Sequence, residues 1–290
     1  MSQPPHALLP QAFFLKRSGA GQRFCLYHPP HPPQGSAPLG RVLYLHPFAE
    51  ELNCTRRMAA SQARALAQAG YAVLQIDLLG CGDSSGDFAD ATWDAWLDDA
   101  QAAHNWLAER AGGPLWLWGL RAGALLAAQL AGRLLEAGTG PSHLLLWQPA
   151  TSGQQMLQQF LRLHAASQWL GNGSSDAMPP AQTLAQGQTV HIAGYALSAA
   201  LAQGLAQARL TPPTAASTQP GRLVWLELST ATAPAISPAA DKAAAAWRAA
   251  GWQVQTQAVA GPAFWQTVDG GDAPALVAAT LAALATATPP

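Results

Sequence analysis

Apolar and polar positions along this chain follow two rhythms that alternate. Two short alternating runs, 12–16 and 23–27, flank a glycine-containing turn at 18–21 and predict a β-hairpin. A proline-rich stretch at 29–38 follows, which we interpret as a stiff surface connector. Beyond it, short apolar runs alternate with longer runs whose apolar positions recur every three to four residues. The pattern predicts strands that alternate with helices.

The regular elements can be placed from this pattern and from residues that start or stop helices. Thr92 is the expected N-cap of one helix, and Gly70 is the expected stop of another. The predicted strands lie at 41–46, 72–77, 114–118, 143–147, 222–228 and 253–259, and the predicted helices at 57–69, 92–111, 122–137, 239–250 and 274–287. Between 149 and 220 the rhythm breaks, with helices at 154–170 and 198–208 and a strand-like run at 189–192.

This order predicts an α/β fold in a single domain. Strands joined by crossover helices form a mostly parallel sheet with helices on both faces. With the two strands of the leading hairpin included, the predicted sheet has eight strands. The core comprises 1–148 and 221–290, and 149–220 is a helical lid inserted after the sixth strand. Open α/β sheets bind ligands at the carboxyl ends of their strands, so we expect the site beneath this lid.

Composition narrows the class of function. With 290 residues, 49% of them hydrophobic and 11% charged, the chain can bury one large core. A net charge of -1 favours neither nucleic acid nor an acidic membrane as partner. No run approaches the roughly 20 apolar residues of a membrane span, and no secretory signal is visible at residues 1–10.

The cysteines and glycines bear on cofactors and on compartment. Three widely spaced cysteines argue for a reducing compartment, the cytoplasm, and against a disulfide framework or a zinc cluster. No glycine-rich phosphate loop is present and no histidine and cysteine spacing fits a metal. We therefore expect no cofactor and no metal.

Four short motifs follow predicted strand ends. They lie at 43–48, 77–84, 118–123 and 261–265. In this order they resemble the α/β-hydrolase fold. The resemblance implies that the first motif supplies an oxyanion-hole N–H, the third is the strand–nucleophile–helix elbow, and the last is the catalytic-histidine loop.

More narrowly, the chain resembles the hydrolase 2 family associated with the exosortase A (PEP-CTERM) sorting system. The likeness is carried by 46–51, 56–58, 119–121, 193–195 and 261–265. It implies a bacterial cytoplasmic protein whose partners belong to the exopolysaccharide and protein-sorting system. It also implies hydrolysis through fold membership, without indicating which bond is cut.

The catalytic triad of such hydrolases is not visible in this sequence. Arg121 occupies the elbow position, and a guanidinium is always protonated, so it is neither a nucleophile nor an ordinary base. No histidine follows His191, and the usual histidine position falls near Ala263. Glu227 is the nearest acid, but it lies within a predicted strand. We therefore predict that standard Ser-His-Asp catalysis is lost.

The remaining groups at this position suit negative charge. The N–H groups of Phe48 and Ala122 are expected to point to one place, at the start of a helix, where Arg121 adds a planar cation. This predicts a small anionic or acyl ligand beneath the lid. Alternatively, Arg121 pairs internally with a carboxylate and merely fills the space, the candidates being Glu50, Glu51 and Asp77.

Other residues are weaker candidates. His46 and Glu50 are candidates for acid–base activation of a bound water, with Arg121 holding substrate charge, whereas a structural His46 would bond to backbone. Ser84 and Trp265 are candidate ligand contacts, although turn formation explains Ser84 as well as substrate contact does, and core packing is the default explanation of Trp265.

Two neighbouring arginines, Arg56 and Arg57, stand at the start of the predicted helix 57–69, which is an unfavourable place for cations. Pairing with Glu50 and Glu51 would offset this cost, or the two arginines form part of the ligand site.

Three functions remain open: an esterase or thioesterase without the usual triad, a catalytically silent binding protein, and an interaction protein that uses the proline-rich loop and the lid as contact surfaces.

Overall fold

The computed structural model describes residues 9–17, 19, 21–31, 36–140, 142–170, 178–213, 221–267 and 271–285, with 163–170 described by their backbone alone. The main sheet has eight strands in the order β1-β2-β4-β3-β5-β6-β9-β10. Their bounds are β1 Gln11–Lys16, β2 Gln22–His28, β3 Gly40–Leu45, β4 Tyr71–Ile76, β5 Leu115–Leu120, β6 His143–Trp147, β9 Arg222–Ser229 and β10 Gln253–Ala260. Strands β1 and β2 pair antiparallel, and β3 to β6, β9 and β10 run parallel. The predicted mostly parallel sheet is confirmed.

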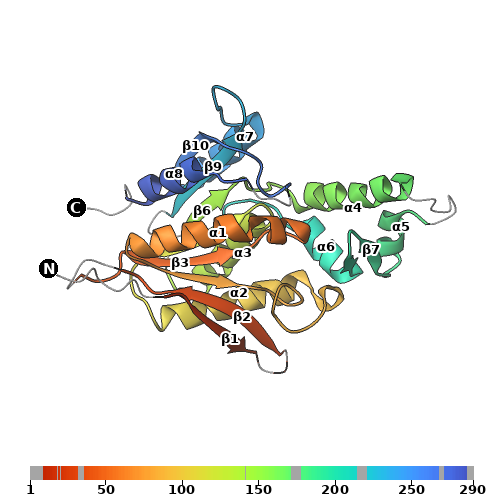
Figure 1. Cartoon of the computed structure of the whole chain (residues 1–290), viewed down its shortest axis with the longest axis horizontal. Helices are drawn as coiled ribbons and strands as arrows, with labels where there is room; N and C mark the ends of the chain where they lie inside the picture. Colours follow the sequence, from red (N-terminus) through yellow and green to blue (C-terminus); the bar gives the residue numbers. More distant parts are fainter. Residues whose placement is uncertain are drawn as a thin grey trace.

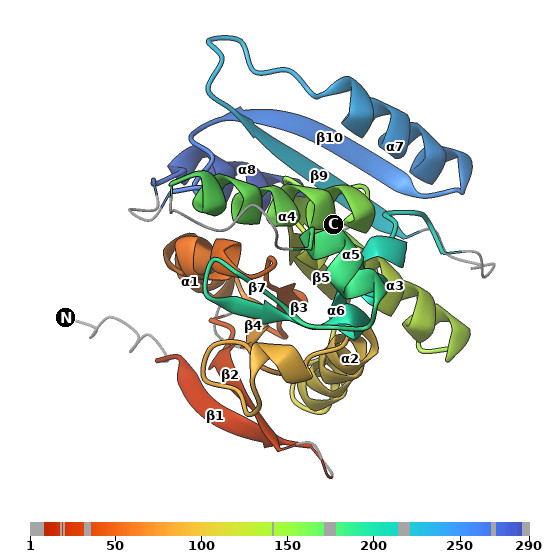
Figure 2. The same ribbon diagram turned by 90° about the vertical axis from the view of Figure 1, so that its right-hand side faces the viewer.

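Helices cover both faces of this sheet (Figures 1 and 2). One face packs against α1 (Glu50–Gln68) and α8 (Pro274–Ala285), and the other against α2 (Trp93–Ala108), α3 (Gly123–Glu136) and α7 (Pro238–Ala249). Because successive side chains of a strand point to opposite faces, each buried strand feeds two cores. In β5, Trp116 and Trp118 join the α1–α8 core, whereas Leu115 and Leu117 join the other.

Several elements lie between β6 and β9, in the range where the sequence predicts a lid. They are α4 (Gly153–Leu170), α5 (Pro180–Ala185), the hairpin β7 (Val190–Ile192) and β8 (Tyr195–Leu197), and α6 (Ala199–Gln207). Positive φ angles at Ala193 (49°) and Gly194 (85°) suit the tight turn of this hairpin. Ser198 caps α6 through the Leu201 N–H, and its hydroxyl donates to the Ala91 carbonyl at 3.1 Å, which ties α6 to the core.

One predicted helix boundary is wrong. The first long helix begins at Glu50, not at residue 57, so Arg56 and Arg57 lie in its second turn. Glu50 and Glu51 occupy the first turn, where carboxylates favour the helix dipole. Arg56 pairs with Asp77 at 3.2 Å and Arg57 with Asp272, and neither pairs with Glu50 or Glu51. The N-cap Thr92 is confirmed, since its side chain accepts the Ala95 N–H.

Three general features of the described chain bear on function. No helix in the described ranges has the length and apolar character needed to cross a bilayer. The three cysteines are free and buried. Within the described residues, no group of three or more histidine, cysteine or acidic side chains is placed to hold a metal ion.

Candidate functional site

Arg121 sits at the apex of a sharp strand–turn–helix connection. It follows β5 directly, has a φ of 55°, and precedes the first residue of α3. Glycines on both sides make this turn feasible. A Cβ at Gly119 would lie 2.5 Å from the Ala124 Cα, and one at Gly123 would lie 2.1 Å from the Leu45 carbonyl oxygen. The start of α3 is therefore pressed against the end of β3.

The loop after β6 holds this turn in place. The Arg121 N–H donates to the Trp147 carbonyl, and the Ala150 N–H donates to the Arg121 carbonyl, both at 3.1 Å. Both backbone groups of a strained residue are thus bonded to one neighbouring loop. These two hydrogen bonds hold the residue in place, which allows a non-glycine residue to keep a left-handed backbone.

Strained backbone gathers at the carboxyl end of the sheet. Ala49 (φ 50°), Arg121 (φ 55°) and Gln148 (φ 40°) follow β3, β5 and β6, which are consecutive in the sheet. Each such conformation costs on the order of 1–3 kcal/mol, and such residues cluster at functional sites. The backbone therefore marks the same edge of the sheet that the motifs indicate.

The Arg121 guanidinium is paired and partly covered. Its Nε and Nη2 both lie 3.1 Å from Glu51 Oε1. Its Nη2 also contacts Met156 Sδ and Gln159 Oε1 of α4, each at 3.5 Å, and the cation lies 5.4 Å from the centre of the Trp265 ring. The internal ion pair considered above is present, with Glu51 as partner. Nη1 has no partner among the described residues.

Glu51 is an unusual carboxylate. Burial raises its pKa above the ordinary value, and the Arg121 cation and its hydrogen bond oppose this rise. Its second oxygen, Oε2, is buried without a hydrogen-bond partner among the described residues.

His46 is bonded to backbone on both sides of its ring. Nδ1 lies 2.8 Å from the Pro47 carbonyl oxygen, and Nε2 lies 3.3 Å from the Leu78 nitrogen. Because the Leu78 N–H is a donor, Nε2 must accept, which makes the ring neutral with its proton on Nδ1. Burial lowers the pKa of His46. The ring therefore has no free nitrogen with which to abstract a proton.

Glu50 is engaged elsewhere. Its Oε2 accepts hydrogen bonds from the Tyr195 hydroxyl at 3.0 Å and the Asn53 amide at 3.2 Å. No hydrogen bond joins it to His46 among the described residues. The structure thus does not bring the two predicted acid–base residues together, and it uses Glu50 to bind the inserted hairpin to α1.

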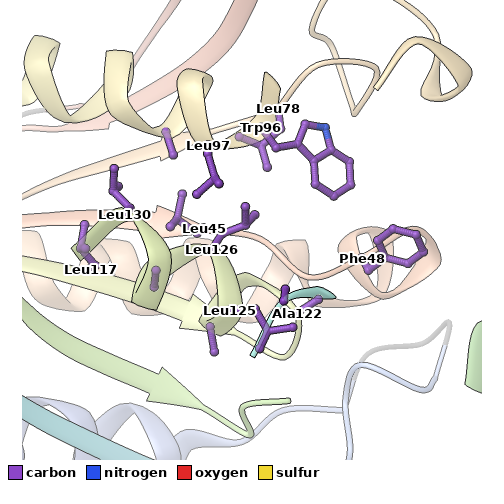
Figure 3. Packing of buried hydrophobic residues seen from close by; sticks show 14 of the residues in the cluster. Leu45, Phe48, Leu78, Trp96, Leu97, Leu117, Ala122, Leu125, Leu126 and Leu130 are labelled. Carbon is purple, nitrogen blue, oxygen red and sulfur yellow. The ribbon is translucent and has the colours of Figure 1, made fainter. Parts of the chain in front are cut away.

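The other predicted ligand contacts have mixed surroundings. Ser84 donates to the Asp77 carbonyl and accepts the Phe24 N–H, so it holds a turn. Phe48 and Ala122 are both buried members of the apolar cluster of which Figure 3 shows a part. Their backbone N–H groups have no acceptor among the described residues, as expected of donors kept for a ligand.

A polar cavity of about 190 Å³ opens beside Arg121. Its walls come from the loop after β6, the first turns of α4, the end of β9 and the start of α7. The polar residues that line it are Arg121, Gln148, Thr151, Ser152, Gln155, Gln159, Glu227 and Ser237. Glu227 is fully engaged, because its oxygens accept from the Trp225 indole and from the N–H and hydroxyl of Ser237.

The glutamines of this cavity were not predicted as site residues. Gln148 directly follows a predicted parallel strand, which is the one sequence signal that could have indicated it. Gln155 and Gln159 lie on one side of a helix rich in glutamine, and nothing in its sequence distinguishes them from Gln154 and Gln158.

The sheet order, the elbow and the inserted segment together define an α/β-hydrolase-fold protein. The chain belongs to the Hydrolase_4 family, described as serine aminopeptidase, S33, whose model matches residues 36–213. Zebrafish (Danio rerio) lysophosphatidylserine lipase ABHD12 is 33% identical over 120 residues, 41% of this chain and 30% of that protein. Human (Homo sapiens) protein ABHD12B is 31% identical over 112 residues, 38% of this chain and 30% of its own length. The chain spans under a third of the length of these curated relatives.

Solved structures support the same fold. Est1E from Butyrivibrio proteoclasticus with bound ferulic acid aligns with a TM-score of 0.60 at 14% identity, covering 95% of this chain and 98% of that one. XC6422 from Xanthomonas campestris, described as a serine hydrolase without lid, aligns with a TM-score of 0.55 at 16% identity over 99% of both chains. At these identities the likeness concerns the fold alone.

Proposed function

We propose that this protein binds a small anionic ligand at the position where related hydrolases carry their nucleophile, and that it does not hydrolyse through a Ser-His-Asp triad. One observation carries the proposal: Arg121 occupies the left-handed elbow and lines a polar cavity. A guanidinium there cannot attack a carbonyl carbon, but it can hold an oxyanion.

The surrounding groups support binding over bond cleavage. The loop after β10 places the Trp265 ring against Arg121, where a serine hydrolase of this fold needs an imidazole. The N–H groups of Phe48, before α1, and of Ala122, the N-cap of α3, have no acceptor among the described residues. A hydrolase uses such donors for a transient oxyanion, and the Ala122 donor adds to the positive potential beside Arg121.

The cavity favours an anionic ligand over an acyl chain. Its polar walls suit hydrogen-bonding oxygens, and an acyl chain needs an apolar wall. An apolar groove of about 740 Å³ does exist, between α4, α5 and α6, lined by residues such as Leu157, Leu161 and Leu184. It shares no lining residue with the cavity beside Arg121, because the two lie against different sides of α4.

Assays for hydrolysis test this proposal. We expect the purified protein to turn over nitrophenyl acetate, nitrophenyl butyrate and acyl-CoA no faster than its Arg121→Ala variant, and to escape labelling by a fluorophosphonate serine probe. Arg162→Ala, at an exposed position on α4, is the matched control. Labelling of a serine, or turnover that falls at least tenfold in Arg121→Ala but not in Arg162→Ala, would overturn it.

A second candidate is an esterase or thioesterase that works without the triad. Membership of a hydrolase family and the similarity to lipases favour it. It would use His46 and Glu50 to activate water, with Arg121 holding the substrate charge. Turnover that disappears in His46→Ala while the variant stays folded is the result that supports this candidate.

The cellular setting and the lid are part of the proposal. The likeness at 46–51 and 261–265 supports a role beside the exosortase A system in the bacterial cytoplasm, with partners from that system. The contacts of Met156 and Gln159 with Arg121 support segment 149–220 as a lid over the site. Deletion of the gene should alter exopolysaccharide output or protein sorting, and an unchanged phenotype would contradict the setting.

A further inference from the structure

Gln148 lies beside Arg121 with its amide orientation fixed. Its Oε1 accepts the Leu228 backbone N–H at 2.8 Å. Because a backbone nitrogen can only donate, the side-chain oxygen must face Leu228, which leaves the Nε2 group as the free end. Nε2 makes no hydrogen bond with a described residue. The structure thus holds a rigid, unpaired pair of donors at this point.

Backbone hydrogen bonds join the loop that holds Gln148 to the turn that holds Arg121. Gln148 has a φ of 40°, and its N–H donates to the Leu226 carbonyl at 2.8 Å. Trp147, which directly precedes it, and Ala150, two residues after it, make the two hydrogen bonds that hold the Arg121 backbone. Arg121 and Gln148 both line the cavity of about 190 Å³.

The cavity is lined by hydrogen-bond donors, so its ligand should carry several hydrogen-bond acceptors. The Nη1 of Arg121 and the Nε2 of Gln148 have no partner among the described residues, and both residues line the cavity, so each can donate to one oxygen of a carboxylate. Thr151, Gln155 and Gln159 supply further hydroxyl and amide groups, which both donate and accept and so match the hydroxyl groups of a ligand.

Charge and size restrict the ligand further. The carboxylate of Glu51 neutralises much of the Arg121 charge, and the Glu227 carboxylate lies in the cavity wall. A ligand with two negative charges would be repelled by both, so a singly charged group is favoured over phosphate. The volume of about 190 Å³ corresponds to roughly six water molecules.

We propose that the cavity between Arg121 and Gln148 binds a small, singly charged hydroxycarboxylate, whose carboxylate lies between the Arg121 guanidinium and the Gln148 amide. This inference rests on the proposed function and gives its ligand class. The hydroxyl groups of the ligand bond to the glutamines at the start of α4, which places that helix over the bound molecule.

Calorimetric titration at constant ionic strength tests the ligand class, with glycerate, propionate, glycerol and inorganic phosphate as probes. We expect glycerate to bind at least about tenfold more tightly than each of the other three, as the loss of one or more charge-assisted hydrogen bonds predicts. Equal or tighter binding of propionate or phosphate would overturn the hydroxycarboxylate inference while the proposed anion site stands. Failure of all three anions to bind would overturn both.

A substitution at Gln148 tests the position of the ligand. Gln148→Glu keeps an oxygen for the Leu228 N–H but replaces the two donors by charge, so the local structure is retained. We expect this variant to bind glycerate at least about tenfold more weakly than the wild type does. Gln154→Glu makes the same change on the side of α4 that faces the apolar groove, and should leave the affinity unchanged. Equal effects of the two variants, or no effect of Gln148→Glu, would show that glycerate does not bind here.

Discussion

The Nη2 atom of Arg121 lies 3.1 Å from the Oε1 atom of Glu51, although the two residues are 70 positions apart in the chain. This ion pair joins the elbow after β5 to the first turn of α1. It explains how a permanent cation is tolerated in a largely buried turn, since an unpaired charge there would be costly. Among the described residues, Glu51 Oε2 and Arg121 Nη1 have no hydrogen-bond partner.

Removing the cation of this pair should destabilise the protein. We expect Arg121→Met to lower the free energy of unfolding by about 1–3 kcal/mol, and the same substitution to lower it by clearly less in a Glu51→Gln background, where the partner charge is already absent. Urea unfolding of the four proteins measures this. The exposed pair of Arg110 and Glu109, at 3.4 Å, is the matched control and should show a coupling below about 1 kcal/mol. Additive losses at Arg121 and Glu51 would contradict a direct interaction.

The raised pKa of Glu51 predicts a pH dependence of stability. Burial raises this pKa above its ordinary 4.5, so the folded protein binds the proton more readily than the unfolded chain does. The bound proton therefore stabilises the folded protein. This contribution is complete below pH 4.5 and is lost as the pH rises through the raised pKa of Glu51. The unfolding free energy of the wild type, relative to Glu51→Gln, should therefore fall with rising pH in that window. A relative stability that rises with pH there would contradict the raised pKa.

Gly123 should tolerate no larger residue. A methyl group at this position would lie 2.1 Å from the Leu45 carbonyl oxygen, so we expect Gly123→Ala to cost about 1–3 kcal/mol of stability or more. Gly132 lies in the same helix, and its nearest neighbour to an added Cβ is Pro213 Cβ at 3.9 Å. Gly132→Ala should raise stability by about 0.5–1 kcal/mol. Thermal unfolding compares the two, and equal shifts would show that α3 is not pressed against β3.

The His46 side chain should contribute to the stability of the folded protein. Its removal leaves the buried Leu78 N–H and Pro47 carbonyl without their partner, so His46→Ala should cost about 2–4 kcal/mol in urea unfolding. His191, exposed on β7, is the control, and His191→Ala should change stability by less than about 0.5 kcal/mol. A His46→Ala variant with unchanged stability would mean that its ring is free for another role.

The sequence predicted the sheet well because burial leaves a plain pattern. Central parallel strands such as β5 are apolar throughout, and their order follows from crossover connections. The start of α1 was missed because its first turn, Glu50 to Asn53, is polar apart from Leu52 and so resembles a loop. The 180–185 helix and the short 195–197 strand were missed because such short elements carry little periodicity.

The site could be predicted only in part. The place of Arg121 on the elbow follows from the order of motifs, since a fold fixes which strand ends meet, whereas ligand binding by Arg121 and by the Phe48 and Ala122 N–H groups stays a prediction. The choice of Glu51 over Glu50 or Asp77 as partner depends on which side of α1 faces the elbow, and the missed helix start concealed it. The role of Gln148 depends on a backbone angle and on one hydrogen bond to β9, which no local pattern encodes.

Nuclear magnetic resonance offers the most direct view of an anion at the elbow. In a titration of the ¹⁵N-labelled protein with glycerate, we predict saturable shifts of the Arg121 Nε–H and the Gln148 side-chain amide, both with one dissociation constant. Shifts confined to other parts of the protein, with these two signals unchanged at saturation, would contradict the claim that the elbow position holds an anion.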